Sequence, residues 1–369
     1  MKIASVEAIH LRLPEVKEVA DGTQDVLIIR VQADNGLVGL GEVVSCSYVG
    51  KAVIESPRSA PFRHGLAAIV RGMDVDDIEG IARAAEEGTA WYGPGGIARH
   101  AYSGVDMALW DLRSQAAGVP LRRLLSTTAV DSVPAYASVL WPERPDLVGD
   151  SARAFVDAGY RYVKYGWAPM GPDLNLDVEL VAAAREALGD DLGLMVDAGR
   201  AWTTTEAMKR AERFAEYDIF WLEEPLHPYD NAGYAELSAA SPVPIAGGEA
   251  VTLLEEYEAL LATGLHIVQP DLGRVGGITY AQRLATAAHA HGCRPVPHAY
   301  GTGVLLAASA QWTAAAPAPL TEFTQAPSPL ARDLAQHTMD FRDGHLYLDD
   351  TPGLGVTLDE DVINRYRVD

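Results

Sequence analysis

Ionisable side chains end one short apolar segment after another in the second half of the chain. They are Lys164, Asp197, Glu223, Glu249, Asp271, His298 and Glu322. From Asp197 to Glu322 they recur every 22 to 27 residues, so each would come from one strand-and-helix unit. In a parallel barrel the carboxyl ends of the strands share one face, where active sites are built. The pattern therefore predicts one site that gathers carboxylates, a lysine and a histidine.

Three of these residues, Asp197, Glu223 and Glu249, are carboxylates expected on adjacent strands. Three carboxylates in one place repel one another unless a cation neutralises them. Hard oxygen ligands favour Mg²⁺, with coordination positions left for water and substrate. A single acidic residue at a strand end more often caps a helix or faces solvent. The shared placement of all three is what predicts a Mg²⁺ site.

Acid–base chemistry is expected from His298, which has a suitable pKa, and from Asp271, which would orient the imidazole and raise its basicity. Glu322 would donate a hydrogen bond to a substrate carboxylate if a dry environment keeps it protonated, and an ordinary surface glutamate is the alternative. Lys164 has three open roles. It can neutralise a substrate carboxylate, act as a base with a lowered pKa, or form a structural salt bridge with Asp197 or Glu223.

Eight apolar segments are predicted to be the strands that position these side chains. They read VPAYASV, YRYVKYG, LGLMVDAG, IFWLEEP, VPIAGGE, HIVQPD, RPVPHAY and LTEFT. Between them lie amphipathic stretches such as VELVAAAREALG, which are long enough to cross back over a sheet. The α/β pattern predicts a (β/α)8 barrel. An open doubly wound sheet is the alternative, but no GxGxxG follows a first strand.

The residues on either side of the barrel have a different character. Residues 1 to about 50 read as antiparallel strands with a turn at Asp34-Asn35-Gly36. A helical stretch follows, with an apolar stripe formed by Ala101, Val105, Ala108, Leu109 and Leu112. We expect an α+β capping domain over 1–128, the barrel over 129–330, and a C-terminal segment over 331–369 that returns to the capping domain.

The composition narrows the partners. A net charge of −22 repels a phosphate backbone and argues against nucleic-acid binding. The sequence has no apolar run long enough for a membrane span and no signal peptide at its start, so we expect a cytoplasmic protein, and a homo-oligomer. Cys46 and Cys293 match no metal or disulfide spacing and are expected to be buried free thiols.

The residues and their order resemble the enolase superfamily, within it the subgroup named for mandelate racemase and muconate lactonizing enzyme. VDAG, WLEEP and GGE are similar to its metal strands, QPDLGRVGG and PVPHAYGTG to its acid–base strands, and SGVDMALWDLRSQAAGVPLRRLL to its capping-domain helix. The resemblance implies Asp197, Glu223 and Glu249 as Mg²⁺ ligands, Asp271 and His298 as the dyad, and Glu322 as the acid that polarises the substrate carboxylate. In WLEEP the first glutamate is chosen, because strand alternation points Glu224 outward.

The sequence departs from the subgroup pattern at two positions. Many members carry Lys-x-Lys on the second strand, where this chain has Lys164-Tyr165-Gly166, so the lysine that usually acts as the opposing base is absent. Gly199 stands where the family often has asparagine. Interconversion of two stereoisomers generally requires a proton acceptor on each face of the planar intermediate. The loss of the second lysine therefore argues against a racemase.

These features favour a carbon–oxygen lyase that removes the α-proton of a small carboxylate and expels the β-hydroxyl. The expected enzyme is a Mg²⁺-dependent dehydratase that turns an aldonate or aldarate into a 2-keto-3-deoxy acid, with His298 as base and then acid. The alternatives are a racemase, epimerase or cycloisomerase on the same scaffold, a metal hydrolase, and a non-catalytic binding barrel. Loops around 20–25 and 44–49, with 91–94 near, are expected to select the substrate.

Overall fold

The computed structural model describes residues 1–316 and 320–368, beginning with a three-stranded antiparallel sheet. Its strands are β1 (Ile3–Arg12), β2 (Asp25–Ala33) and β3 (Val38–Val43). The β2–β3 turn is the predicted one: Gly36 has a φ of 89°, a conformation that glycine adopts without steric cost, and its N–H donates to Ala33 O. The predicted antiparallel start of the chain is confirmed.

Helices follow this sheet along the chain. They are α1 (Ser47–Glu55), α2 (Leu66–Val70), α3 (Ile78–Thr89), α4 (Ile97–Ala117) and α5 (Leu121–Leu125). The apolar stripe predicted for α4 is fully buried. The helix lies directly on β3, since a Cβ on Gly41 would stand 1.9 Å from Gly104 O. It ends at Gly118, whose left-handed conformation caps the last turn.

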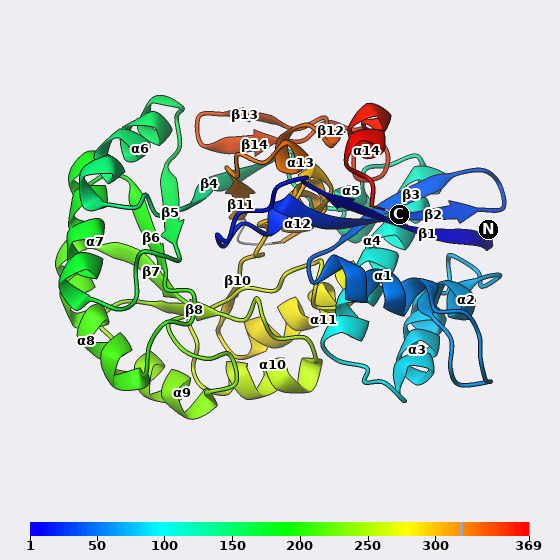
Figure 1. Ribbon diagram of the computed structural model, residues 1–369, viewed down its shortest axis with the longest axis horizontal. Helices are drawn as coiled ribbons and strands as arrows, with labels where there is room; N and C mark the ends of the chain where they lie inside the picture. The colour runs from blue at the N-terminus through cyan, green and yellow to red at the C-terminus, as the bar shows by residue number, and fades with distance from the viewer. Residues whose placement is uncertain (317–319, 369) are drawn as a thin grey trace.

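The barrel occupies the left half of Figure 1, and all eight predicted strands form. They are β4 (Ser132–Leu140), β5 (Tyr162–Gly166), β6 (Gly193–Asp197), β7 (Ile219–Glu223), β8 (Ile245–Gly247), β9 (Ile267–Val268), β10 (Arg294–Pro295) and β11 (Thr321–Thr324). From β4 to β10 each strand pairs in parallel with the next, and β11 pairs in parallel with β4. The order is that of a barrel, which confirms the predicted α/β class with an α+β cap.

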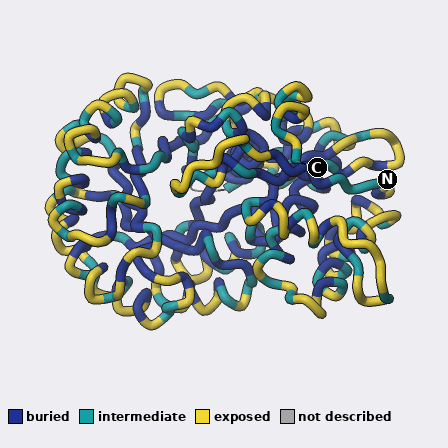
Figure 2. Tube along the Cα trace, in the orientation of Figure 1, coloured by how far each residue is buried: buried dark blue, intermediate teal, exposed yellow. Residues whose placement is uncertain are grey.

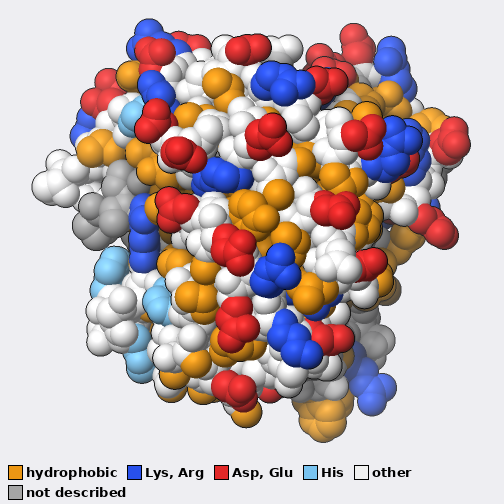
Figure 3. All heavy atoms as spheres, turned by 90° about the vertical axis from the view of Figure 1, so that its left-hand side faces the viewer, with side chains coloured by type: hydrophobic (Ala, Val, Ile, Leu, Met, Phe, Trp, Pro, Cys, Tyr) orange, Lys and Arg blue, Asp and Glu red, His pale blue; other side chains and the backbone are white. Residues whose placement is uncertain are grey.

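Seven helices connect successive barrel strands and surround them. They are α6 (Pro145–Asp157), α7 (Leu174–Leu188), α8 (Thr204–Phe214), α9 (Asn231–Ala240), α10 (Leu254–Leu261), α11 (Gly277–Ala290) and α12 (Gly303–Ala314). Figure 2 shows buried strands inside a ring of helices whose outer faces are exposed. Acidic and basic side chains are interspersed on the outer face of this ring in Figure 3. Apolar side chains fill the barrel interior: Tyr136, Met195, Trp221, Ala246, Ile267, Val296 and Leu320.

The C-terminal segment contacts both parts of the molecule. It contains α13 (Pro329–Arg332), β12 (Ala335–His337), β13 (Asp340–Arg342), β14 (His345–Tyr347), β15 (Val356–Leu358) and α14 (Glu360–Tyr366). β14 pairs antiparallel with β4, whereas Val368 N donates to His10 O on β1, so the C-terminal segment returns to the N-terminal domain (Figure 1). The boundaries at 128 and 330 stay a prediction.

Two smaller observations bear on the sequence analysis. No helix in the described part of the chain is both long enough and apolar enough to cross a bilayer. Both cysteines are free, but only Cys293 is buried. The expectation for Cys46 was wrong, because it occupies the exposed position just before α1.

Candidate functional site

A cavity of about 290 Å³ lies at the carboxyl ends of the barrel strands. Five of the seven predicted site residues line it: Lys164, Asp197, Glu249, His298 and Glu322. The other two are fully buried beside them, because Glu223 contacts Lys164 and Asp271 contacts His298. The structure therefore brings together all seven residues that the strand-end pattern selects.

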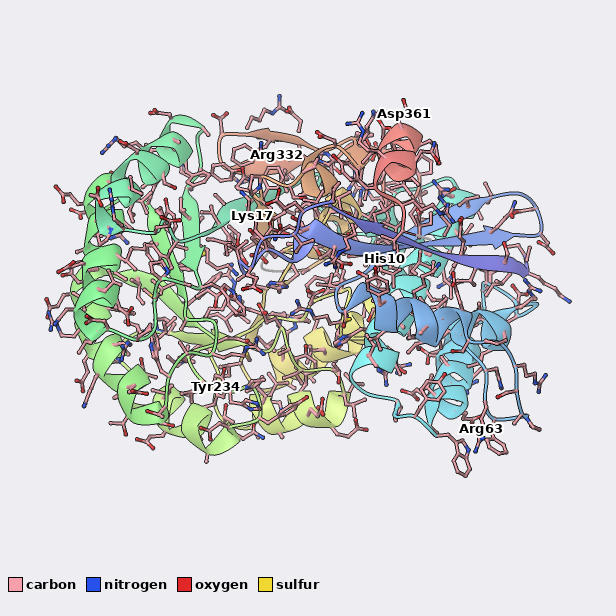
Figure 4. The ribbon with its side chains drawn as sticks, in the orientation of Figure 1. His10, Lys17, Arg63, Tyr234, Arg332 and Asp361 are labelled. Atoms are coloured by element: carbon pink, nitrogen blue, oxygen red, sulfur yellow. The ribbon has the colours of Figure 1, made fainter. Side chains whose placement is uncertain are left out.

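The loop between β1 and β2 reaches over the barrel and covers this cavity. Lys17 marks the position of this loop in Figure 4. Of the predicted substrate loops, residues 20–22 and Val44 line the cavity. The 91–94 segment is not among the lining residues. Trp91 is 70% exposed and stacks on Phe62, next to Arg63 at the opposite edge of the N-terminal domain (Figure 4).

The imidazole of His298 lies between two carboxylates. Its Nδ1 is 2.7 Å from Asp271 Oδ2, and its Nε2 is 3.0 Å from Glu249 Oε2. Gly273 N donates to the other oxygen of Asp271, which fixes that carboxylate. Burial disfavours the imidazolium, but the charges of Glu249 and Glu322 and the Asp271 contact raise the pKa of His298 to about 9. This arrangement holds His298 in its protonated form.

Lys164 forms ion pairs with two buried carboxylates, 2.5 Å to Glu223 Oε1 and 3.0 Å to Glu322 Oε1. Burial opposes the ammonium, yet these charges raise the pKa of Lys164 well above its ordinary value. Lys164 is therefore a permanent cation in this arrangement, not a base with a lowered pKa. Its salt bridge to Glu223 is one of those expected from the sequence.

The surroundings of Glu322 favour its ionised form, whereas the acid role predicted for it requires the protonated form. Its Oε2 accepts a hydrogen bond from Ala299 N at 2.5 Å. Burial would raise its pKa, but the charges of Lys164 and His298 outweigh that effect and lower it. The sequence could not reveal this, because both cations come from other strands and their contacts with Glu322 are not local in sequence.

The three predicted metal ligands come from neighbouring strands, with Asp197 in register with Glu223. Burial, followed by the charge of Glu223, raises the pKa of Asp197 well above its ordinary value. The two oxygens of Glu223 already accept hydrogen bonds, one from Lys164 and the other from Trp221 Nε1 and Gln269 Nε2. Burial opposes ionisation of Glu249, but His298 and Arg274 lower its pKa to about 2.

These carboxylates fit a divalent cation by chemical type and by strand placement. In residues 1–316 and 320–368, no three side chains of His, Cys, Asp or Glu are grouped closely enough to hold a metal ion. The reason is that Glu223 faces Lys164 and Glu249 faces His298. A bound cation would have to exchange these ion pairs, and it would relieve the repulsion that raises the pKa of Asp197.

Three further residues near the site were not selected from the sequence. Glu224 is absent from the cavity lining but is buried just after the end of β7. Burial, and then the charge of Glu249, raises the pKa of Glu224 to about 8. Arg274, which contacts Glu249 and Asp271, and Gln269 were not selected. Both stand in or beside the QPDLGRVGG segment, so their proximity to Asp271 was the available signal.

Comparison with known proteins agrees with the fold. Residues 7–126 match the family described as mandelate racemase / muconate lactonizing enzyme, N-terminal domain, and residues 147–362 match enolase C-terminal domain-like. Together the two matches span most of the chain. The chain belongs to the mandelate racemase and muconate lactonizing enzyme family, and it is an enzyme of the enolase superfamily.

Similar proteins fall into more than one reaction class. D-galactarolactone cycloisomerase of Agrobacterium fabrum is 32% identical and covers 93% of this chain and 91% of its own. L-talarate/galactarate dehydratase of Salmonella typhimurium is also 32% identical, and the match covers 91% of this chain and 81% of that protein. A racemase from Streptomyces coelicolor A3(2), solved with bound magnesium, has a TM-score of 0.87 and 29% identity, and covers 99% of this chain and 100% of its own.

Proposed function

We propose that this chain is a Mg²⁺-dependent acid-sugar dehydratase that converts an aldonate or aldarate into a 2-keto-3-deoxy acid. The observation that carries the proposal is asymmetry in the cavity. His298, backed by Asp271, is its one imidazole among the described lining residues, while β5 ends in Gly166 without a second lysine. Dehydration requires only one such group, because the same imidazole can accept a proton and then return it.

Binding of the substrate carboxylate is assigned to the cationic part of the cavity. Lys164 offers a buried ammonium, and Arg274 offers a guanidinium beside Glu249. Asp197, Glu223 and Glu249 would hold Mg²⁺, which supplies positive charge to a substrate that gains negative charge when its α-proton leaves. The donor set and the known magnesium-bound neighbour both support this assignment.

The proton transfer is assigned to His298 Nε2. This nitrogen takes the α-proton, the C–H electron pair forms a carbon–carbon double bond, and the imidazolium protonates the departing β-hydroxyl. Water leaves, and the resulting enol becomes the 2-keto acid. Since the charge of Glu249 holds the pKa of His298 at about 9, neutralising Glu249 favours the neutral imidazole that this first step needs.

A cycloisomerase is the second candidate, because the relative from Agrobacterium fabrum carries that name. It would use the same α-proton abstraction but would leave the mass of the substrate unchanged. A racemase or epimerase with Lys164 as the second base is disfavoured, because two carboxylates hold this lysine as a cation.

The test is a screen of acid sugars and their lactones with Mg²⁺, read by mass spectrometry and by a colour reaction for 2-keto acids. The dehydratase proposal expects a product that has lost one water, and no turnover after EDTA treatment. A product of unchanged mass would replace it with the cycloisomerase. Turnover that survives EDTA would reject the metal requirement.

A further inference from the structure

Trp167 stands at the cavity in an unusual backbone conformation. It follows directly on β5, lines the cavity together with Asp197 and His298, and is half-buried. Its φ is 68°, in the left-handed region that bulky side chains rarely adopt. Such strain persists only where the surrounding structure fixes it, and it is concentrated at ligand-binding sites. The outlier therefore calls for a role at the cavity.

Two glycines make room for this arrangement. A Cβ on Gly199 would come within 2.9 Å of Trp167 Cδ2 and 3.0 Å of Cε3. A Cβ on Gly166 would come within 2.8 Å of Asp197 Cβ, so even alanine would force that side chain to move. Gly166 and Gly199 are the two departures from the subgroup pattern, and both adjoin the Trp167–Asp197 contact. One structural feature thus accounts for both.

Two backbone hydrogen bonds hold the main chain of Trp167, and one contact involves its ring. Trp167 N donates to Asp197 O at 3.1 Å, and Trp167 O accepts from Met170 N at 3.2 Å. The guanidinium of Arg200 lies 5.5 Å from the ring centroid, within the range of a cation–π interaction. The backbone of Trp167 is thereby attached to β6, the strand that ends in Asp197, and its ring lies near the segment that follows this strand.

The indole and the imidazole approach the cavity from different sides. Strands β6 to β9 separate β5 from β10 on one side of the barrel, and β11 and β4 separate them on the other. We propose that Trp167 is a specificity-determining residue whose ring packs on the C–H face of the sugar-acid carbon chain, in the space that Gly166 and Gly199 leave free. This inference rests on the proposed function and names the group that holds its substrate. An apolar ring there offers no proton acceptor, which fits a one-base reaction.

The experiment compares Trp167→Ala and Trp167→Phe with Trp91→Ala, a matched control that removes an exposed indole outside the cavity. Kinetics are measured on five- and six-carbon aldonates and aldarates that differ in stereochemistry. Trp167→Ala should raise KM about tenfold or more and change kcat less. It should also reduce the differences in kcat/KM between diastereomeric substrates. Trp167→Phe should have a KM close to that of the wild type, because it keeps an aromatic ring. Gly199→Ala, which crowds the ring, should shift KM in the same direction.

The inference is overturned if Trp167→Ala keeps both KM and stereochemical preference, or if Trp91→Ala has the same effect. Calorimetric titration of galactarate into each variant with Mg²⁺ separates this inference from the proposed function. If the wild type turns over no acid, the dehydratase proposal fails, but weaker galactarate binding by Trp167→Ala still supports the role of Trp167. Equal binding by the two proteins, or no binding by either, overturns it.

Discussion

Two groups of buried carboxylates in this molecule have different partners. At the barrel mouth, Glu223 and Glu249 pair with the cationic side chains Lys164 and His298. Between the N-terminal domain and the barrel, Glu42 and Asp106 accept hydrogen bonds mainly from backbone N–H and hydroxyl groups at the start of barrel helices. Burial alone therefore does not distinguish a functional carboxylate from a structural one.

The interdomain carboxylates act as helix caps supplied by another domain. Glu42 on β3 receives Thr302 N, Thr302 Oγ1 and Leu305 N at the start of α12. Asp106 on α4 receives Thr279 N and Oγ1 at the start of α11. Negative charge at a helix N-terminus is stabilising, and these two helices follow the strands β10 and β9 that carry the dyad. Backbone partners are fixed, whereas side-chain partners can be exchanged for a ligand.

The largest expected effect is the loss of activity in His298→Asn. We expect kcat to fall by about 10³-fold, because the residue proposed to move the proton is removed. The free energy of unfolding should change far less than it does when the interdomain residue Glu42 is replaced by alanine. Steady-state kinetics with thermal unfolding measure both quantities, and His289→Asn on the exposed face of α11 is the control. Activity close to that of the wild type would remove His298 from the mechanism.

The second effect concerns stability at the interdomain region. Glu42→Ala leaves three buried donors without their acceptor, so we expect the free energy of unfolding to fall by about 3 kcal/mol. Since Thr302 lies four residues after His298, activity should also fall through displacement of the imidazole. Denaturant unfolding measures the change, with Glu55→Ala on α1 as an exposed control. A loss no larger than that of the control would contradict the capping role.

The sequence predicts the barrel-mouth carboxylates and not the interdomain ones, for a physical reason. Asp197 and Glu223 each end a strand and Glu249 follows the end of β8, so a local pattern repeated along the chain reveals a common position. Glu42 and Thr302 are 260 residues apart in sequence, and the residues around each of them give no local pattern that predicts the hydrogen bond between them. The same limit explains Glu322, whose ionised state depends on cations from other strands.

The third effect is a pH dependence of stability. Burial raises the pKa of Asp111 on α4 to about 6, although Leu354 N and Leu40 N donate to it. The folded state therefore favours the protonated acid. The contribution of Asp111 to the free energy of unfolding is fully present below about pH 4 and is lost as the pH rises through 6, and it amounts to at most about 3 kcal/mol. Glu249, with a pKa lowered to about 2, has the opposite sign. Urea unfolding from pH 4.5 to 7 should show the stability advantage of the wild type over Asp111→Asn shrinking; a constant difference would refute the assignment.

The smallest expected effect is the stabilisation of the folded protein by Mg²⁺. It distinguishes the two groups of carboxylates directly, because only carboxylates that bind the cation contribute to it. Mg²⁺ at ten times its dissociation constant stabilises a protein that binds it only when folded by about 1.4 kcal/mol. Asp106→Asn should retain this gain even if it is less stable overall, since its partners are backbone and threonine groups of α11. Asp197→Asn should lose it, since burial and then the charge of Glu223 raise the pKa of that carboxylate, which therefore has the most to gain from a cation. Thermal unfolding with and without Mg²⁺ measures both, with Ca²⁺ as a comparison ion. An equal stabilisation of both variants by Mg²⁺ would contradict the proposal that the carboxylates at the barrel mouth, and not the interdomain ones, bind the cation.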